Sequence, residues 1–334
     1  MMELLASTAS AMVADGKGIL AADESTGTIA KRFASLGVAS TEGTRLDYRQ
    51  IVVGAPGLSE FISAVIFYDE TLRQGMPDGR PIATFLAAQG MIPGIKVDRG
   101  LVALAPSSAE QVTDGLDGLA ARLVEYRDLG ARFAKWRAVF HIGPGRPSAA
   151  AIEVNAWLLG RYARVSQDGG LVPIVEPEVL MNGAHSLEDC ASATSRTLVA
   201  VFSELREHGV LLSGMVLKPN MVTPGSAVFA SASPAEVARR TVEVLRAHVP
   251  AEVPGVTFLS GGQSEVDATA NLDEIAKLGP HPWRISFSFG RALQASALRA
   301  WGGRHENAEA AQLALLERAR ANSDVLRRAM SITT

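Results

Sequence analysis

Short apolar segments alternate with longer amphipathic segments along this chain of 334 residues. Apolar runs of this length are typical of strands buried on both faces, as in a parallel sheet with helices packed against it. Because each run is followed by a helical pattern, the sequence predicts an α/β fold, a single (β/α)8 TIM barrel rather than an open sheet. We expect its eight strands at residues 18–23, 61–68, 92–98, 131–140, 171–178, 214–219, 256–262 and 284–290.

The predicted helices carry sequence signals at their ends. The clearest one begins with Ser233 as N-cap, Pro234 at the first helical position and Glu236 three residues after the cap, which is a capping box. No linker interrupts the pattern, so residues 1–334 are expected to form one domain, with 75–90 as its longest irregular stretch. Four helices are expected between strands, at 108–130, 148–169, 185–209 and 233–249, with extra terminal helices at 3–14 and 307–330.

Charged residues gather at the downstream ends of these strands. Lys135 and Arg137 are two residues apart, so the alternation of a strand points both side chains to one face. In a TIM barrel the carboxyl ends of all the strands meet, and active sites form there. The same spacing recurs at two more strand ends, in the pairs Glu176 with Glu178 and Lys96 with Asp98.

Lys218 ends the apolar segment 214–219 together with Pro219, which stops the strand. Burial removes the solvation of a charged amine, and the neutral amine that is favoured is a nucleophile for a carbonyl carbon. Lys218 is therefore the candidate for a Schiff base with a carbonyl substrate. Asp23 and Glu176, at two other strand ends, are the candidate acid and base groups, and Lys135 is expected to supply positive charge beside the nucleophile.

Two polar clusters are candidate phosphate sites. One follows the last two strands, where barrels commonly bind phosphate through glycine N–H groups and a helix N-terminus. The other follows the first strand at 25–33 and contains Lys31 and Arg32, which Lys96 could join. Two phosphate sites flanking a nucleophilic lysine predict a small-molecule sugar bisphosphate as substrate. The first cluster comprises Ser260, Gly261, Gly262, Ser288, Gly290 and Arg291.

Composition limits the other partners. The net charge is −3 and no long basic run is present, so we expect no nucleic acid as partner. The six histidines are dispersed without ligand-pair spacing, so we expect neither a metal nor another cofactor. The single cysteine, Cys190, lies in a helical segment and is expected to be structural. No segment reaches 18 uncharged apolar residues, which predicts no membrane span and a cytoplasmic location.

Seven segments carry a family resemblance and occur in order from residue 16 to residue 294. Together they resemble the signature segments of the class I, Schiff-base fructose-1,6-bisphosphate aldolases. The resemblance implies a (β/α)8 barrel, usually a homotetramer, that cleaves fructose 1,6-bisphosphate without a metal in glycolysis and gluconeogenesis. The segments are GKGILAADESTGTIAKRF (16–33), GIKVDRG (94–100), FAKWRAV (133–139), PIVEPEVL (173–180), VLKPNMVTPG (216–225), FLSGGQSE (258–265) and FSFGRALQ (287–294).

The resemblance also implies roles for single residues. Lys218 would attack the ketose carbonyl at carbon 2, and Glu176 would deliver protons for carbinolamine formation and dehydration. Asp23 would take the proton of the carbon 4 hydroxyl, Lys135 would supply positive charge, and Glu178 would be a supporting carboxylate. The 1-phosphate pocket of the family corresponds to Ser260, Gly261, Gly262, Gly290 and Arg291, and its 6-phosphate side to Ser25, Thr28, Lys31, Arg32 and Lys96, with Arg137 close to the sugar.

The chain differs from the better-known members at three places. Thr28 stands where they have serine and keeps a hydroxyl, and Phe289 stands where they have tyrosine and keeps the ring. The well-known animal enzymes continue into a tail whose terminal tyrosine assists proton transfer at the enamine, whereas this sequence stops at Thr334. We expect another group, or water, to move that proton, and loss of all enamine proton exchange on replacing Thr334 alone would contradict this expectation.

Two other interpretations remain open at this point. A transaldolase-like or 2-keto-3-deoxy-phosphogluconate-type aldolase would also have a lysine on its sixth strand, but it should lack the second phosphate cluster. A non-catalytic barrel that binds a sugar phosphate as a sensor or scaffold should tolerate loss of Lys218 or Asp23, and both residues are present.

Overall fold

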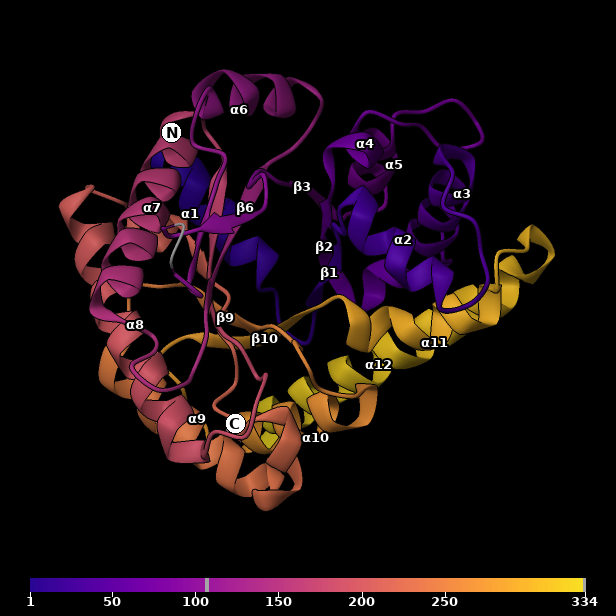
Figure 1. Cartoon of the computed structure of the whole chain (residues 1–334). Helices are drawn as coiled ribbons and strands as arrows, with labels where there is room; N and C mark the ends of the chain where they lie inside the picture. The colour runs from indigo at the N-terminus through magenta and orange to yellow at the C-terminus, as the bar shows by residue number, and fades with distance from the viewer. Residues whose placement is uncertain (106–107, 333–334) are drawn as a thin grey trace.

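Eight parallel strands close into a barrel in the computed structural model, which describes residues 1–105 and 108–332 (Figure 1). The order around the barrel is β1-β10-β9-β8-β7-β6-β3-β2, so the first and last strands pair and leave no edge. The prediction of a (β/α)8 TIM barrel is confirmed. The strands are β1 Gly18–Ala22, β2 Ile62–Phe67, β3 Ile92–Lys96, β6 Phe133–Phe140, β7 Val172–Val179, β8 Val216–Leu217, β9 Gly255–Phe258 and β10 Arg284–Phe289.

Helices surround the barrel and separate successive strands (Figure 1). The expected capping box is present, since the Ser233 side chain accepts from the Glu236 N–H and the Glu236 side chain accepts from the Ser233 N–H. The helices are α1 Met2–Met12, α2 Thr26–Ala34, α3 Glu42–Val53, α4 Asp69–Leu72, α5 Ile82–Ala88, α6 Leu119–Asp128, α7 Ala149–Asp168, α8 Leu187–Glu207, α9 Pro234–His248, α10 Glu265–Lys277, α11 Arg291–Trp301 and α12 Ala308–Ile332. The two extra terminal helices are therefore α1 and α12.

Two sequence expectations about local structure were wrong. A helix was expected over 108–130, but α6 begins only at Leu119, and β4 (Leu101–Ala103) pairs antiparallel with β5 (Gln111–Thr113) before it. Gly115 and Gly118 have φ values of 125° and 67°, a left-handed region that a continuous helix does not contain. The stretch 75–90 was expected to be irregular, but it contains α5.

The barrel interior and the outer layer form two apolar cores. Inside the barrel, Ile19, Ala64 and Phe133 pack with Leu5 and Ala9 of α1, which closes the end at which the strands begin. The outer core fills the space between strands and helices; there the Trp136 ring stacks on Tyr162 with centroids 5.5 Å apart. Because Trp136 faces outward, Lys135 and Arg137 on either side of it face the opposite way, toward the carboxyl end of the barrel interior.

The interior packing makes a prediction about glycine in β3. A Cβ on Gly94 would lie 2.2 Å from the buried Phe133 ring, so Gly94→Ala should lower the free energy of unfolding by about 1–3 kcal/mol. Gly27→Ala is the matched control, since its Cβ would meet nothing within 4 Å, and it should stay within about 0.5 kcal/mol of the parent. Urea unfolding of the three proteins measures both values, and equal effects of the two substitutions would contradict this packing.

Candidate active site

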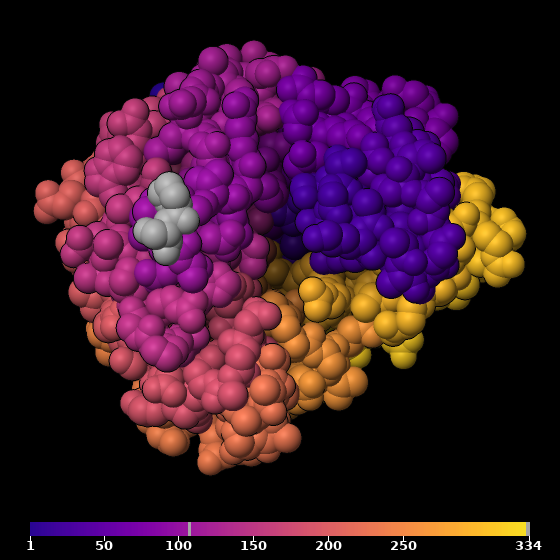
Figure 2. All heavy atoms as spheres, viewed as in Figure 1, coloured from indigo at the N-terminus to yellow at the C-terminus, as the bar shows by residue number. Residues whose placement is uncertain are grey.

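The carboxyl ends of the strands surround a cavity of about 270 Å³. The molecular face in Figure 2 is hollowed where the N-terminal segment, in indigo, meets the central and C-terminal segments. Fifteen of the predicted site residues line this cavity, so residues far apart in the sequence meet as expected. They are Asp23, Ser25, Thr28, Arg32, Lys96, Lys135, Arg137, Glu176, Glu178, Lys218, Ser260, Gly261, Ser288, Gly290 and Arg291.

The centre of the cavity is a chain of buried ion pairs. Lys135 Nζ lies 2.7 Å from Asp23 Oδ2 and 3.0 Å from Glu176 Oε2. The other oxygen of Glu176, Oε1, lies 3.1 Å from Lys218 Nζ. Lys218 is only 3% exposed, and the other three groups are also buried. Glu176 therefore touches both amines, and Lys135 touches both carboxylates.

These contacts fix the charge of the groups. Burial raises the pKa of Asp23, but the charge interactions with Lys135 and then with Lys218 outweigh it and hold the pKa well below the ordinary value. Burial likewise opposes ionisation of Glu176, and Lys135 and Lys218 again lower its pKa. For Lys135 burial acts to lower the pKa, yet Asp23 and Glu176 raise it above the ordinary value. Both carboxylates and the Lys135 ammonium are thus ionised near neutral pH.

Two more ion pairs lie around this centre. Arg137 Nε donates to Glu178 Oε2 at 2.5 Å, and Lys96 Nζ donates to Asp98 Oδ1 at the same distance. Gly261 approaches Glu178 so closely that a Cβ at this position would lie 2.3 Å from Glu178 Oε1. A side chain at residue 261 would therefore have to displace this carboxylate, which is held by Arg137.

Two helix N-termini face the cavity from neighbouring strands, since α2 follows β1, α11 follows β10, and these two strands pair. Gly290 is the N-cap of α11 and Arg291 its first residue, while Ser25 is the N-cap of α2 and accepts a hydrogen bond from the Thr28 N–H. Helix N-termini present N–H groups and positive potential to anions. The buried hydroxyl of Ser288 has no hydrogen-bond partner among the described residues, so it is available to a bound molecule. These N–H groups and the Ser288 hydroxyl can therefore bind anionic groups at this edge of the cavity.

Some expected residues lie elsewhere. Lys31 lines a neighbouring pocket between α2 and α11, and Gly262 does not line the catalytic cavity, since it forms a turn with φ of 80° beside Met181. Phe289 packs on Phe287 in the core, and Cys190 is buried, in agreement with a structural role. Thr334 lies outside the described residues.

Sequence reasoning missed two charged residues next to the site. Glu24 lines the cavity, and Arg49 of α3 is ion-paired with it at 2.5 Å. Glu24 directly follows Asp23 at a strand end, which was a usable signal, whereas Arg49 lies in a helix that was not predicted. A buried arginine has no signature that separates it from an exposed one in a single sequence.

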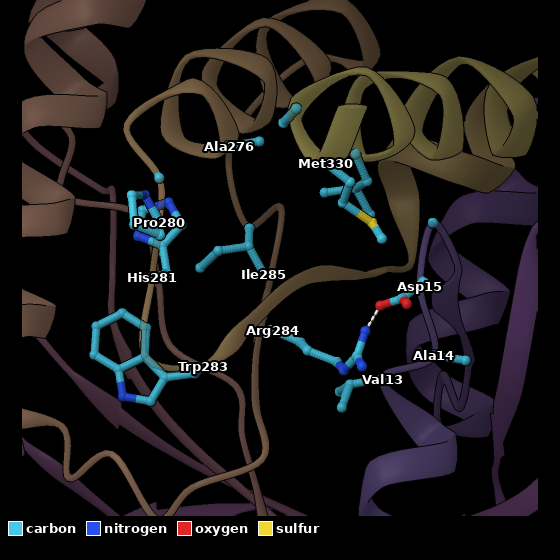
Figure 3. Close-up of a pocket in the computed structure, with 14 residues that line it drawn as sticks. Val13, Ala14, Asp15, Ala276, Pro280, His281, Trp283, Arg284, Ile285 and Met330 are labelled. Atoms are coloured by element: carbon cyan, nitrogen blue, oxygen red, sulfur yellow. Dashed lines mark ion pairs between the residues drawn. The ribbon is translucent and has the colours of Figure 1, made fainter. Parts of the chain in front are cut away.

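A further cavity of about 180 Å³ lies at the end of the barrel where the strands begin (Figure 3). Figure 3 shows Trp283, Ile285 and Met330 among its lining side chains, and Arg284 paired with Asp15. None of the predicted site residues lines it. It is mainly apolar and lies apart from the ion pairs described above.

A buried lysine that contacts a carboxylate at the carboxyl end of a closed parallel barrel defines the class of lysine-dependent (β/α)8 enzymes. The sequence model of the family described as fructose-bisphosphate aldolase class-I matches residues 4–330. The chain belongs to the class I fructose-bisphosphate aldolase family. The activity of this family is the reversible aldol cleavage of fructose 1,6-bisphosphate through a lysine Schiff base, a reaction of glycolysis, and this chain is such an aldolase. The two alternative interpretations are therefore set aside.

Relatives from distant organisms support this assignment. Fructose-bisphosphate aldolase 1 of Toxoplasma gondii is 54% identical over 322 residues, covering 96% of this chain and 89% of that protein. A probable class 1 aldolase of Xanthomonas axonopodis pv. citri is 52% identical over 96% of both chains. A solved structure of the Plasmodium falciparum aldolase, in complex with TRAP and a small-molecule inhibitor, superposes with a TM-score of 0.96 at 51% identity and covers 98% of this chain and 94% of that one.

The buried ion pairs predict a dependence of stability on pH. The pKa of Asp23 is lower in the folded chain than its ordinary value of 3.8, so its contribution is complete above that pH and is lost as the pH falls through the lowered pKa. Between about pH 5 and about pH 3 the parent should therefore lose roughly 1 kcal/mol more unfolding free energy than Asp23→Asn. Urea unfolding at both pH values measures this difference.

The exposed Asp128→Asn is the control for that experiment. It removes a carboxylate that lies far from Lys135, so its loss of stability over the same pH interval should follow the parent. If Asp23→Asn also followed the parent, Asp23 would not be held ionised by its contacts in the folded chain.

Proposed function

We propose that Lys218 is the Schiff-base nucleophile of this aldolase, with Glu176 and Asp23 as its proton-transfer groups. The observation that carries the proposal is the contact of 3.1 Å between Lys218 Nζ and Glu176 Oε1 inside a buried site. A carboxylate at this distance takes a proton from the amine and returns it to the carbinolamine hydroxyl, which leaves as water. Glu176 thus serves both the addition and the dehydration at carbon 2.

Asp23 acts in the carbon–carbon cleavage. As an ionised carboxylate it accepts the proton of the carbon 4 hydroxyl, and the bond between carbons 3 and 4 breaks as the aldehyde forms. The electron pair of that bond moves into the protonated imine on Lys218 and yields an enamine. Glyceraldehyde 3-phosphate departs, and protonation at carbon 3 followed by hydrolysis releases dihydroxyacetone phosphate. Lys135 keeps Asp23 ionised and ready to accept the proton.

The outer groups bind the substrate. The 1-phosphate contacts the cluster after β9 and β10, and the 6-phosphate contacts the cluster around the N-terminus of α2 and Lys96. Arg137 lies close to the sugar and is held by Glu178. The proposed 1-phosphate residues are Ser260, Gly261, Ser288, Gly290 and Arg291, and the 6-phosphate residues are Ser25, Thr28, Arg32 and Lys96, all of which line the cavity.

We further propose one domain over residues 1–334, a cytoplasmic location and assembly into a homotetramer. One domain agrees with the pairing of β1 with β10 and the packing of α12 on α10 and α11. No helix in residues 1–105 and 108–332 is long and apolar enough to cross a membrane. Several relatives are named cytosolic isozymes, for example one of Arabidopsis thaliana at 52% identity.

Exposed apolar side chains on neighbouring elements support the proposed assembly. Trp157 of α7 is 42% exposed and Val199 of α8 is 56% exposed, and α7 packs along α8. Val154, one turn before Trp157, and Val102 of the β4-β5 hairpin are exposed as well. Exposed apolar side chains on elements that pack together are typical of subunit interfaces.

Borohydride trapping tests the nucleophile. The protein is incubated with dihydroxyacetone phosphate, reduced with borohydride in the presence and absence of EDTA, and the added mass is located by peptide mapping. The expected result is one reduced adduct on Lys218 that EDTA does not change, because the imine forms without a metal.

Lys218→Met should abolish this adduct, while Lys277→Met, which removes an exposed lysine, should retain it. An adduct on another lysine in the parent would assign the nucleophile elsewhere. No adduct with dihydroxyacetone phosphate still bound would leave a barrel that binds sugar phosphates without the proposed chemistry.

The proposed interface predicts the effect of a charge on α7. Trp157→Glu places a carboxylate where an apolar contact is expected, so the tetramer should dissociate into smaller species. Val266→Glu is the control, since Val266 is exposed on α10 away from these elements. Sedimentation velocity distinguishes the species, and an intact tetramer of Trp157→Glu would contradict this choice of interface.

A further inference from the structure

A buried carboxylate, Glu24, holds two guanidinium groups beside the substrate cavity. Arg49 Nη2 donates to Glu24 Oε2 at 2.5 Å, and Arg32 Nη1 donates to Glu24 Oε1. Glu24 and Arg49 are both buried, whereas Arg32 is partly exposed and lines the cavity. Glu24 therefore lies between one guanidinium that faces the substrate and one that does not.

The buried guanidinium is fixed by the helices around it. Arg49 has only 3% of its side chain exposed, and its Nη1 donates to Gln294 Oε1 at 3.4 Å. Gln294 of α11 donates from Nε2 to Ala21 O at 2.8 Å and to Glu24 Oε1 at 3.1 Å. The cluster thus ties the end of β1 to α2, α3 and α11, which lie in the same part of the molecule in Figure 1.

The charges of this cluster do not cancel. Two guanidiniums share one carboxylate, so one positive charge remains. Burial opposes ionisation of Glu24, but Arg49 and then Arg32 lower its pKa, so the carboxylate is ionised near neutral pH. Arg49 cannot carry the surplus charge to a ligand, because it does not line the cavity. Arg32 can, since its guanidinium has no hydrogen-bond partner other than Glu24 in the described part of the chain.

We propose that Arg49 is a positioning residue for substrate binding. It neutralises Glu24 from the side that faces away from the cavity, so that the positive charge of Arg32 is available to the 6-phosphate of the substrate. This inference rests on the proposed function, in which Arg32 belongs to the 6-phosphate side. Without Arg49, the negative charge of Glu24 would be balanced by Arg32 alone, and this neutral pair would attract a phosphate only weakly. With Arg49 in place, Glu24 still anchors Arg32 and stays paired when Arg32 binds a phosphate.

The experiment compares a ligand that carries the 6-phosphate with one that does not. Fructose 1,6-bisphosphate cleavage gives kcat and KM, and borohydride trapping with dihydroxyacetone phosphate gives a half-saturating concentration that depends on the 1-phosphate side. Arg49→Met should raise the KM for the bisphosphate about tenfold, the effect of losing one charge-assisted contact. The kcat and the half-saturating concentration of dihydroxyacetone phosphate should change by less than about twofold, because Lys218 and the 1-phosphate side are untouched.

A second variant separates charge balance from simple structural support. Glu24→Gln/Arg49→Met again leaves one positive charge, on Arg32, because it removes the carboxylate that neutralises Arg32 in Arg49→Met. Its KM should return to within about threefold of the parent, below that of Arg49→Met. Arg49→Lys keeps the charge but lacks the planar fork, so its KM should lie between those of the parent and Arg49→Met.

Arg45→Met is the matched control. Arg45 lies on the same helix and pairs with Glu70, but it does not line the cavity. The kcat, the KM and the half-saturating concentration of dihydroxyacetone phosphate should therefore equal those of the parent. The inference is overturned if Arg49→Met raises the KM for the bisphosphate and the half-saturating concentration of dihydroxyacetone phosphate by the same factor. It is also overturned if the KM of the double variant is no lower than that of Arg49→Met. A parent that traps no dihydroxyacetone phosphate on Lys218 would instead overturn the proposed function, and this inference with it.

Discussion

The placement of Lys135 between two carboxylates is the interaction on which the rest of the site depends. A single buried carboxylate or ammonium is strongly unfavourable, so each of these groups must find an opposite charge within the barrel. Lys135 satisfies Asp23 on one side and Glu176 on the other, which leaves the second oxygen of Glu176 for Lys218. The four groups come from β6, β7 and the ends of β1 and β8, and only a closed barrel brings those strand ends together. The chemistry therefore follows from closure of the sheet.

Charge is balanced differently at the centre and at the edge of the cavity. At the centre two carboxylates face two amines, and the proposed proton transfer between Lys218 and Glu176 leaves the total charge unchanged. The protonated imine proposed on Lys218 would lie beside the Glu176 carboxylate, so covalent catalysis would create no unpaired charge in the interior. At the edge, Arg32 and Arg49 exceed Glu24 by one charge, which suits a ligand that brings negative charge of its own. A centre of paired charges and a cationic edge fit a substrate with a neutral carbonyl between two phosphates.

Much of this arrangement could be predicted from the sequence, because period-two alternation and the position of strand ends decide it. Lys135 and Arg137 flank an outward Trp136, and their shared face follows from that spacing alone. Even β8, which has only two residues, was found, since Pro219 marks the strand end after Lys218. The prediction of one helix over 108–130 was wrong because the apolar residues of this segment match a helical pattern, whereas Gly115 and Gly118 turn the backbone. Arg49 was not identified from the sequence, because the burial of a charged residue depends on partners from distant segments. Here the partners are Glu24 and Gln294, and no local pattern contains them.

The residues of the site differ in how firmly the fold fixes their positions. Lys135, Glu176 and Glu178 lie on strands of the sheet. Lys135 has partners on both β3 and β7, and the two glutamates pair with β6. Arg32 lies instead on a nine-residue helix, and its guanidinium is positioned by one carboxylate. Groups that perform covalent chemistry need fixed geometry, whereas a phosphate carries several equivalent oxygens and tolerates more freedom in its partner. Lys135 and Glu176, beside the proposed carbonyl chemistry, are thus held by the backbone of the sheet. Arg32, which is proposed to bind the phosphate, is held mainly by its ion pair with Glu24.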